Sequence, residues 1–220
     1  CHLFFKIMDN TYFVYAMLCF TSFLTLANPL GTMPVFLTLT QNFDEKERSR
    51  VLKKAIIVAF FVMIAFTVFG QFIFKFFGLS TNGFRIVGGI VIFKIGFDML
   101  QARFTPVKAT ETEIQDYAND ITVTPLAIPI LCGPGAIANG IVLMEEATDT
   151  TMMVILISTI VLVFLITYLI LKASTKLLEI LGETGNNVMM RLMGLILMVI
   201  AVECFFSGLK PIMRDFIASL

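Results

Sequence analysis

The stretch NTYFVYAMLCFTSFLTLANPLGTMPVFLTLTQNF, residues 10–43, contains no charged residue and decides the class of fold. The hydrocarbon core of a bilayer is about 30 Å thick, so a helix that crosses it needs about 20 mostly apolar residues. This stretch is longer than that, and the segments 55–74, 121–144 and 150–171 are also free of charge. Four such segments in a chain of 220 residues predict a multi-pass membrane protein rather than a soluble domain.

Composition narrows the functional classes. Hydrophobic residues make up 58% of the chain, and charged residues make up 15%, against about a quarter in a typical soluble domain. The 16 basic and 16 acidic residues cancel and form no basic stripe, which argues against nucleic acid as a partner. The only histidine is His2, and the four cysteines share no C-x-x-C spacing, so we expect no metal site and no cofactor. The first apolar run is too long for a cleavable signal peptide.

The apolar pattern predicts six helical spans. Continuous apolar runs without two-residue alternation favour helices over the strands of a barrel. A charged helix start is expected at 44–54 and a polar loop at 172–187. Proline removes a backbone donor and clashes with the preceding turn, so we expect the first and fourth spans to be broken, with a re-entrant first segment as the alternative. The expected spans are residues 12–41, 55–74, 84–101, 121–144, 151–171 and 188–209.

The two halves of the chain match at an offset of about 105 residues. Each half has a broken span, a plain span and a span that opens with Arg-x-x-Gly, and the acidic Asp98 falls on Glu203. We therefore divide the chain into a first repeat at 1–102, a polar linker at 103–120 and a second repeat at 121–220. Because each repeat has an odd number of spans, the second must be inverted relative to the first. The predicted fold is an all-α membrane protein of six transmembrane helices in two inverted three-helix repeats, with helices one and four broken.

Basic residues in the loops predict the orientation, because cytoplasmic loops carry an excess of lysine and arginine. One face collects nine basic residues and the other four. The loop after the first span is therefore expected in the cytoplasm, and both termini outside. This assignment fails if the first segment is re-entrant rather than spanning.

The two helix breaks are the predicted substrate site. Carbonyls freed before a proline suit a cation or a substrate ammonium, and the start of a half-helix suits a carboxylate. The alternatives are a proline kink without a ligand, glycines that serve close packing, and polar side chains that bond to their own helix. The candidate substrate-binding residues are Thr25, Asn28, Pro29, Gly31, Thr32, Gly133, Pro134, Gly135 and Asn139.

Charged residues within the third and sixth spans are candidates for coupling or gating. They are Arg85, Asp98, Arg191 and Glu203. Lys94 and Asp98 are four residues apart and share a helix face, while Gly89 and Gly96 lie on roughly the opposite face, which is expected to pack against a neighbour. The alternative interpretation, which we favour, is that Lys94 snorkels to the headgroups with Asp98 beside it, and that both arginines are interfacial anchors.

Several motifs resemble those of the MarC family of membrane proteins. They are ANPLGTMP at 27–34, PLAIPILCGPGAI at 125–137, RIVGG at 85–89 followed by DML at 98–100, and RLMGL at 191–195. The resemblance covers the chain from about residue 12 to 210, although Lys94 stands where an apolar residue is expected. It implies six membrane spans and, from some relatives, transport of small neutral amino acids such as glycine and alanine.

The favoured function is secondary transport of small neutral amino acids across the bacterial inner membrane, coupled to a proton or sodium gradient. The chain lacks the G-x-x-x-x-G-K-[ST] motif of ATP-driven enzymes. An intramembrane enzyme would need a nucleophile–base pair or a metal set that one histidine supplies poorly. A channel, or a partner subunit without coupled transport, is the alternative. The expected partners are a small-molecule substrate, the lipid bilayer and the coupling ion, and the oligomeric state is left open.

Overall fold

The computed structural model describes residues 2–40, 43–101 and 122–218, and every element in these ranges is a helix. The all-helical class predicted from the sequence is confirmed, whereas the predicted linker at 103–120 lies outside the described residues. In chain order the helices are α1 (His2–Ala27), α2 (Pro29–Leu39), α3 (Glu45–Phe77), α4 (Thr81–Leu100), the π-helix η1 (Thr122–Leu131), α6 (Pro134–Glu146) and α7 (Thr150–Ala218).

Local sequence explains where α3 begins and ends. The Asp44 carboxylate accepts a hydrogen bond from the Glu47 amide at 2.6 Å, which satisfies one of the free donors at the helix start. The predicted charged helix start at 44–54 is thus confirmed. At the other end Gly78 has φ 64°, a left-handed conformation that glycine adopts without strain and that commonly ends a helix.

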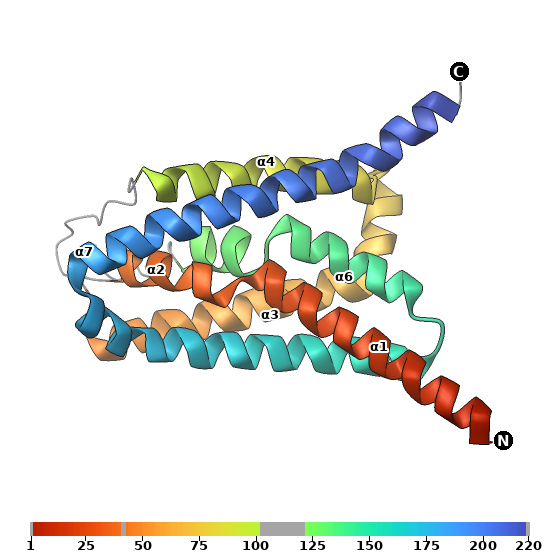
Figure 1. Ribbon diagram of the computed structural model, residues 1–220, viewed down its shortest axis with the longest axis horizontal. Helices are drawn as coiled ribbons and strands as arrows, with labels where there is room; N and C mark the ends of the chain where they lie inside the picture. The colour runs from red at the N-terminus through yellow and green to blue at the C-terminus, as the bar shows by residue number, and fades with distance from the viewer. Residues whose placement is uncertain (1, 41–42, 102–121, 219–220) are drawn as a thin grey trace.

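The chain crosses the molecule repeatedly in alternating directions (Figure 1). α1 and α2 follow one another across it, α3 runs back, and α4 returns. η1 and α6 then cross together in the direction of α3. α7 turns back on itself, so that a first arm, Thr150–Ser174, and a second arm, Asn187–Ala218, run in opposite directions.

The sequence-based expectation of a polar loop at 172–187 is wrong. The chain reverses direction in this segment but remains helical throughout. The reason is that polarity and helix propensity are separate properties. Lysine, leucine, alanine and glutamate, which dominate residues 172–181, are all good helix formers, so the polar composition of this part does not prevent a helix; residues 182–187, GETGNN, have no such explanation.

Within the described residues, four segments have the length and apolar composition to cross a membrane: Thr11–Leu39, Glu45–Phe77, Thr150–Ser174 and Asn187–Ala218. The two other predicted spans do not meet this standard. α4 has 20 residues but carries Arg85, Lys94 and Asp98, and the fourth predicted span is divided between η1 and α6, of 10 and 13 residues. The structure thus supports a multi-pass membrane protein, and the count of six spans stays a prediction.

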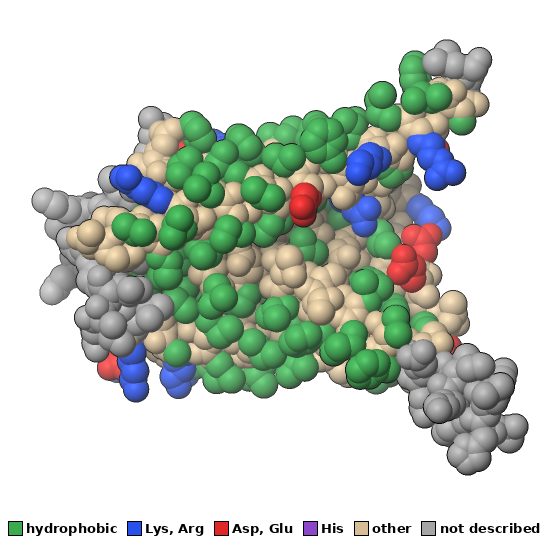
Figure 2. All heavy atoms as spheres, in the orientation of Figure 1, with side chains coloured by type: hydrophobic (Ala, Val, Ile, Leu, Met, Phe, Trp, Pro, Cys, Tyr) green, Lys and Arg blue, Asp and Glu red, His purple; other side chains and the backbone are tan. Residues whose placement is uncertain are grey.

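The outer surface has the character expected of a protein embedded in lipid. Large apolar side chains stand exposed, among them Phe61, Phe72 and Phe76, with exposed fractions of 64%, 71% and 73%. Apolar side chains cover the middle of the face shown in Figure 2, and most of the charged side chains gather toward its two ends. Such broad apolar exposure is rare on soluble monomers and marks a surface that meets lipid or protein.

α4 packs closely against the second arm of α7 through glycine. A Cβ atom at Gly96 would lie 2.8 Å from the carbonyl oxygen of Gly194, and one at Gly89 would lie 2.7 Å from that of Ala201. Small residues that let two backbones approach are typical of helix contacts in membranes. The predicted packing of the glycine face is confirmed. The 105-residue offset relates these two contacts to each other, because Gly89 corresponds to Gly194 and Gly96 to Ala201. The contact of Gly96 with Gly194 is thus the counterpart of the contact of Gly89 with Ala201.

Candidate functional site

The first helix break lies at Asn28, between α1 and α2. Asn28 has φ 39° and ψ 62°, a left-handed conformation that asparagine tolerates better than most residues. Its side-chain oxygen accepts a hydrogen bond from the Gly31 amide at 3.1 Å and so caps α2. Pro29 then occupies the first position of α2, where its missing donor and fixed φ suit a helix start. The break therefore follows from the local Asn-Pro sequence.

Two neighbours complete this break. The Thr32 hydroxyl donates to the carbonyl oxygens of Asn28, at 3.1 Å, and of Ala27, at 3.3 Å. It therefore bonds to its own chain, the alternative considered above for polar groups near the break. Gly31 leaves room for the cap, because a Cβ atom there would collide with the Asn28 side-chain nitrogen. That nitrogen, Nδ2, is buried and has no hydrogen-bond partner.

The second break lies at Gly133, between η1 and α6. The Cys132 amide donates to the Ala127 carbonyl at 2.9 Å, which closes the last wide turn of η1. Gly133 is extended, and a Cβ atom there would lie 2.8 Å from the Pro129 carbonyl oxygen, so this position favours glycine. Pro134 begins α6, and no side chain caps this helix start. The first amides of α6 are therefore available to a ligand, unlike the Gly31 amide of α2.

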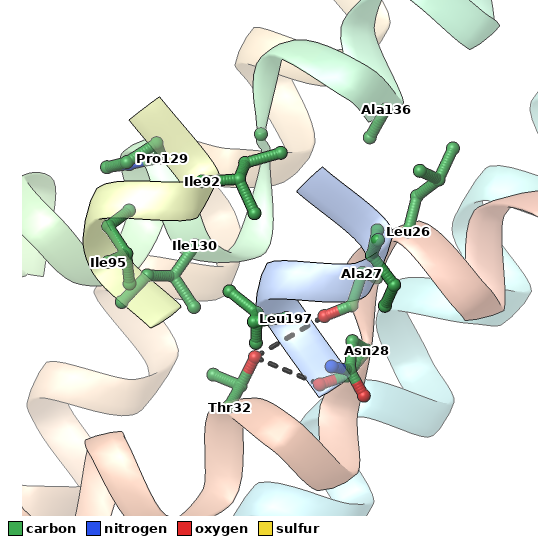
Figure 3. Close-up of a pocket in the computed structure, with 12 residues that line it drawn as sticks. Leu26, Ala27, Asn28, Thr32, Ile92, Ile95, Pro129, Ile130, Ala136 and Leu197 are labelled. Carbon is green, nitrogen blue, oxygen red and sulfur yellow. Dashed lines mark hydrogen bonds between the residues drawn. The ribbon is translucent and has the colours of Figure 1, made fainter. Parts of the chain in front are cut away.

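A small cavity lies where the two breaks meet (Figure 3). Its volume is about 30 Å³. A single water needs roughly 10–15 Å³ on this scale, so the cavity has room for about two waters. Its lining comes from α1, α2, α4, η1, α6 and the second arm of α7: Leu26, Ala27, Asn28, Thr32, Ile92, Ile95, Pro129, Ile130, Gly133, Ala136, Leu197 and Ile200.

The cavity is lined by residues that correspond in the two halves of the chain. Asn28 corresponds to Gly133 at the offset of 105 residues, and each of them lies at a helix break. Ile92 of α4 pairs with Leu197 of α7, and Ile95 pairs with Ile200, at the same offset. Each half thus contributes one break and two of these corresponding aliphatic side chains to the same space.

The predicted substrate residues fall into three groups. Asn28, Thr32 and Gly133 line the cavity. Pro29, Gly31, Pro134 and Gly135 shape the breaks without lining it, and Pro134 packs against Gly88 of α4. Thr25 and Asn139 are turned away from it: Thr25 is exposed, and the Asn139 side-chain nitrogen donates to the Ser22 hydroxyl at 3.1 Å.

The aliphatic residues that α4 and the second arm of α7 contribute to the cavity were missed by the sequence reasoning. Ile92, Ile95, Leu197 and Ile200 lie in apolar helices where nothing distinguishes them from lipid-facing neighbours. The one available signal was the repeat, because the 105-residue offset pairs these four positions with one another.

The candidate coupling residues lie on α4 and the second arm of α7. Arg191 and Glu203 are exposed, and Arg85 and Asp98 are partly buried on α4. The carbonyl oxygen of Arg85 accepts a hydrogen bond from the Cys204 thiol at 3.5 Å. This contact joins α4 to the second arm of α7, at the opposite end of their crossing from Gly194. Within the described ranges none of the four forms an ion pair with another. The same part of the chain holds no cluster of histidine, cysteine and carboxylate residues that suits a metal ion.

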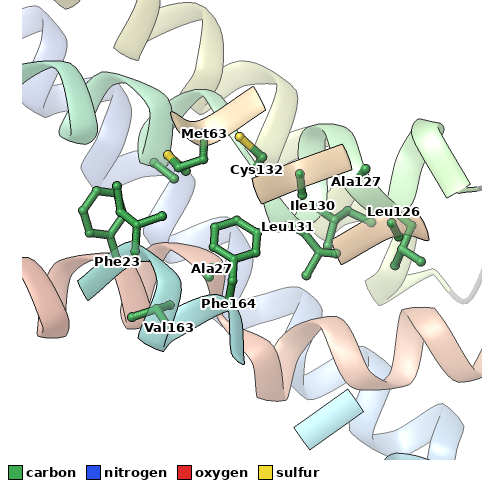
Figure 4. Close-up of a cluster of buried hydrophobic side chains, with 14 of the residues drawn as sticks. Phe23, Ala27, Met63, Leu126, Ala127, Ile130, Leu131, Cys132, Val163 and Phe164 are labelled. Carbon is green, nitrogen blue, oxygen red and sulfur yellow. The ribbon is translucent and has the colours of Figure 1, made fainter. Parts of the chain in front are cut away.

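A buried apolar cluster packs against both breaks (Figure 4). Phe23 and Ala27 approach it from α1, Leu126 and Leu131 from η1, and Phe164 from the first arm of α7. All five side chains are exposed by 5% or less. Close packing of this kind transmits displacement, so a movement of one break is expected to move its neighbours.

A MarC family integral membrane protein model matches residues 13–213, nearly the whole chain. This chain belongs to the MarC family. Its curated relatives include a UPF0056 membrane protein of Methanocaldococcus jannaschii, 39% identical over 92% of this chain and 98% of its own length. The UPF0056 membrane protein YvbG of Bacillus subtilis is 39% identical over 87% of this chain and 92% of its own length. No solved structure matches. The MarC resemblance inferred from the sequence motifs is confirmed, and these relatives carry names that state a membrane protein without an activity.

Proposed function

We propose that this MarC family protein is a secondary transporter of small neutral amino acids. The observation that carries the proposal is the cavity between two helix breaks, to which the two halves contribute corresponding residues. Transporters built from inverted repeats bind substrate near the bilayer midplane, where broken helices of the two repeats meet. Irregular backbone at membrane depth is tolerated only where protein or a water-filled cavity surrounds it.

The breaks offer groups that suit a zwitterion. Asn28 Nδ2 is a buried donor without a partner, and the first amides of α6 lack a side-chain cap. These donors, with the partial positive charge of a helix start, favour a carboxylate. The Ala27 carbonyl lies at the end of α1, where the helix dipole is negative, and it accepts only a long bond from Thr32. We assign the substrate carboxylate to Asn28 and α6, and the ammonium to the end of α1.

The proposal includes the inverted repeat and alternating access. The alternating directions of the chain and the paired contacts of α4 with the second arm of α7 support two three-span halves of opposite orientation. In such folds one unit rocks against the other around a fixed site. The excess of basic residues on the face of the first loop supports a cytoplasmic location for that loop and external termini, in the inner membrane. We assign the driving force to a proton or sodium gradient, and no catalytic step to the chain.

Uptake into proteoliposomes tests the proposal. Purified protein is reconstituted and offered radiolabelled glycine and alanine, with and without imposed proton or sodium gradients. Saturable accumulation that depends on one gradient is the expected result. Flux that neither saturates nor responds to a gradient would favour a channel. No uptake by folded protein present in both orientations would favour a partner subunit.

Asn28→Gly tests the site without disturbing the break. Glycine adopts the left-handed conformation freely and loses only a few tenths of a kcal/mol as an N-cap, so the fold should persist. Loss of a hydrogen bond to a charged group is worth about 1.5–3 kcal/mol, so substrate affinity should fall about tenfold or more. Thr25→Val is the matched control, because Thr25 belongs to the same helix end but is exposed. Equal uptake by Asn28→Gly and wild type would remove this site.

A further inference from the structure

We propose that four branched aliphatic side chains set the upper limit on the size of the transported side chain. These are Ile92, Ile95, Leu197 and Ile200, here called the aliphatic wall. The proposal rests on the transport function above and assigns the selectivity of the same site. The wall is supplied in equal parts by α4 and the second arm of α7, and its members pair at the 105-residue offset.

The wall supplies four of the apolar residues that line the cavity, and the breaks supply its polar groups. Figure 3 shows Ile92 and Ile95 on α4 and Leu197 on α7, whereas Asn28 and Thr32 come from the break between α1 and α2. An amino acid held by its carboxylate and ammonium at the breaks must direct its remaining atoms toward the apolar lining. Its side chain is therefore the part that meets the wall.

The aliphatic wall cannot easily move away from the cavity. Ile92 and Ile95 lie between Gly89 and Gly96, the two glycines through which α4 contacts the backbone of α7. On the facing helix Leu197 and Ile200 lie between Gly194 and Ala201, the partners in those contacts. Backbone-to-backbone contact on both sides of the wall fixes the separation of the two helices, and packed interiors of this kind resist small displacements.

Because the cavity is small, a rigid wall selects substrates by the size of their side chains. A volume of about 30 Å³ has room for about two waters, whereas glycine has five non-hydrogen atoms. Even glycine therefore requires the site to expand, and the breaks, which lack continuous helical bonding, are the part able to move. Each further carbon of a substrate side chain must then displace the wall. One methylene changes selectivity by about 10- to 200-fold in an apolar site, which suffices to separate alanine from valine.

Competition against glycine uptake tests the wall. Proteoliposomes with wild type, Ile200→Ala or Ile95→Ala take up radiolabelled glycine in the presence of unlabelled alanine, valine or leucine. Val199→Ala is the matched control, because Val199 adjoins Ile200 but is 59% exposed and lies outside the cavity lining. Removing three carbons from the wall should improve valine competition relative to alanine by at least tenfold in both wall variants. Val199→Ala should keep the wild-type ratio.

The outcomes separate this proposal from the transport function. Wild type that takes up no glycine would refute transport, and the wall as a transport filter with it. Wild-type uptake with an unchanged valine-to-alanine ratio in both wall variants would refute the wall alone. If the alanine variants fail to fold, Ile200→Val and Ile95→Val remove a single methylene each. These milder variants should still shift the ratio toward larger substrates, and an unchanged ratio in folded protein would also overturn the proposal.

Discussion

A methyl group added at Gly96 should force α4 and the second arm of α7 apart. The new Cβ atom would lie 2.8 Å from the Gly194 carbonyl oxygen and 2.8 Å from Cγ of Met198, against ordinary contacts of 3.4 Å or more. The carbonyl belongs to the backbone and cannot rotate away, so the helices must separate by about half an ångström. A gap of roughly this size forfeits about a quarter to a half of the dispersion energy of the atoms that it parts.

The expected cost of Gly96→Ala follows from two opposing effects. Overpacking typically costs about 1–3 kcal/mol, and alanine recovers up to about 1 kcal/mol through its higher helix propensity. The net loss of about 1–2 kcal/mol should lower the Tm by roughly 2–8 °C for a protein of this size. Loss of helical circular dichroism on heating in mild detergent measures this shift.

Two further variants make the Gly96 experiment decisive. In Gly135→Ala the added carbon would lie 3.4 Å from its nearest neighbours, an ordinary contact, so the Tm should stay level or rise. The double variant Gly96→Ala with Gly194→Ala should cost less than the sum of the two single changes, because the second methyl enters a gap that the first has opened. A Gly96→Ala protein as stable as Gly135→Ala would refute the assignment of this contact as a close backbone packing site.

Three further predictions concern stability. The Met152 amide and the Tyr12 hydroxyl donate hydrogen bonds to the Asp149 carboxylate and hold the pKa of Asp149 below its usual value. The stabilisation from these bonds is therefore present above the unfolded-state pKa and is lost as pH falls through the folded-state pKa. Asp149→Asn should flatten the acid side of a plot of Tm against pH, and an unchanged slope would contradict this. Arg48 donates to the carbonyls of Thr40 at 3.1 Å and Phe43 at 3.4 Å beyond the end of α2, so Arg48→Gln should cost about 1 kcal/mol, or roughly 2–4 °C in Tm, while Arg50→Gln on the exposed side should cost less. The Thr67 hydroxyl is buried without a partner, so Thr67→Val should leave stability unchanged or raise it by about 1 kcal/mol; a clear loss of stability would indicate a hydrogen bond at Thr67.

The helix breaks could be predicted because their causes are local. Asn28-Pro29 and Gly133-Pro134 restrict the backbone wherever they occur, and each stands where one helix ends and another begins. The direction in which neighbouring side chains point was beyond the same reasoning. Thr25 and Asn139 are near the breaks along the chain, yet the turn of each helix carries them away from the cavity.

The rest of the site depends on contacts between distant parts of the chain. Ile92 and Ile200 line the cavity because α4 and the second arm of α7 cross at Gly96 and Gly194, and apolar composition alone does not reveal which face of an apolar helix makes such a crossing. Segment 172–187 shows the opposite limit. Its polar residues indicated an exposed connection, but its lysines, leucines and glutamates are good helix formers, and the chain stays helical while it turns.

The crossing of α4 with the second arm of α7 has a consequence for the synthesis of the protein. α4 is synthesised well before its partner, the second arm of α7. Until the second arm of α7 is synthesised, the glycine face of α4 lacks its backbone partner. The charged residues Arg85, Lys94 and Asp98 make insertion of α4 into lipid by itself unfavourable. A chain truncated before residue 187 should therefore leave α4 without its packing partner, so the stable insertion of α4 depends on a segment about 100 residues later in the sequence.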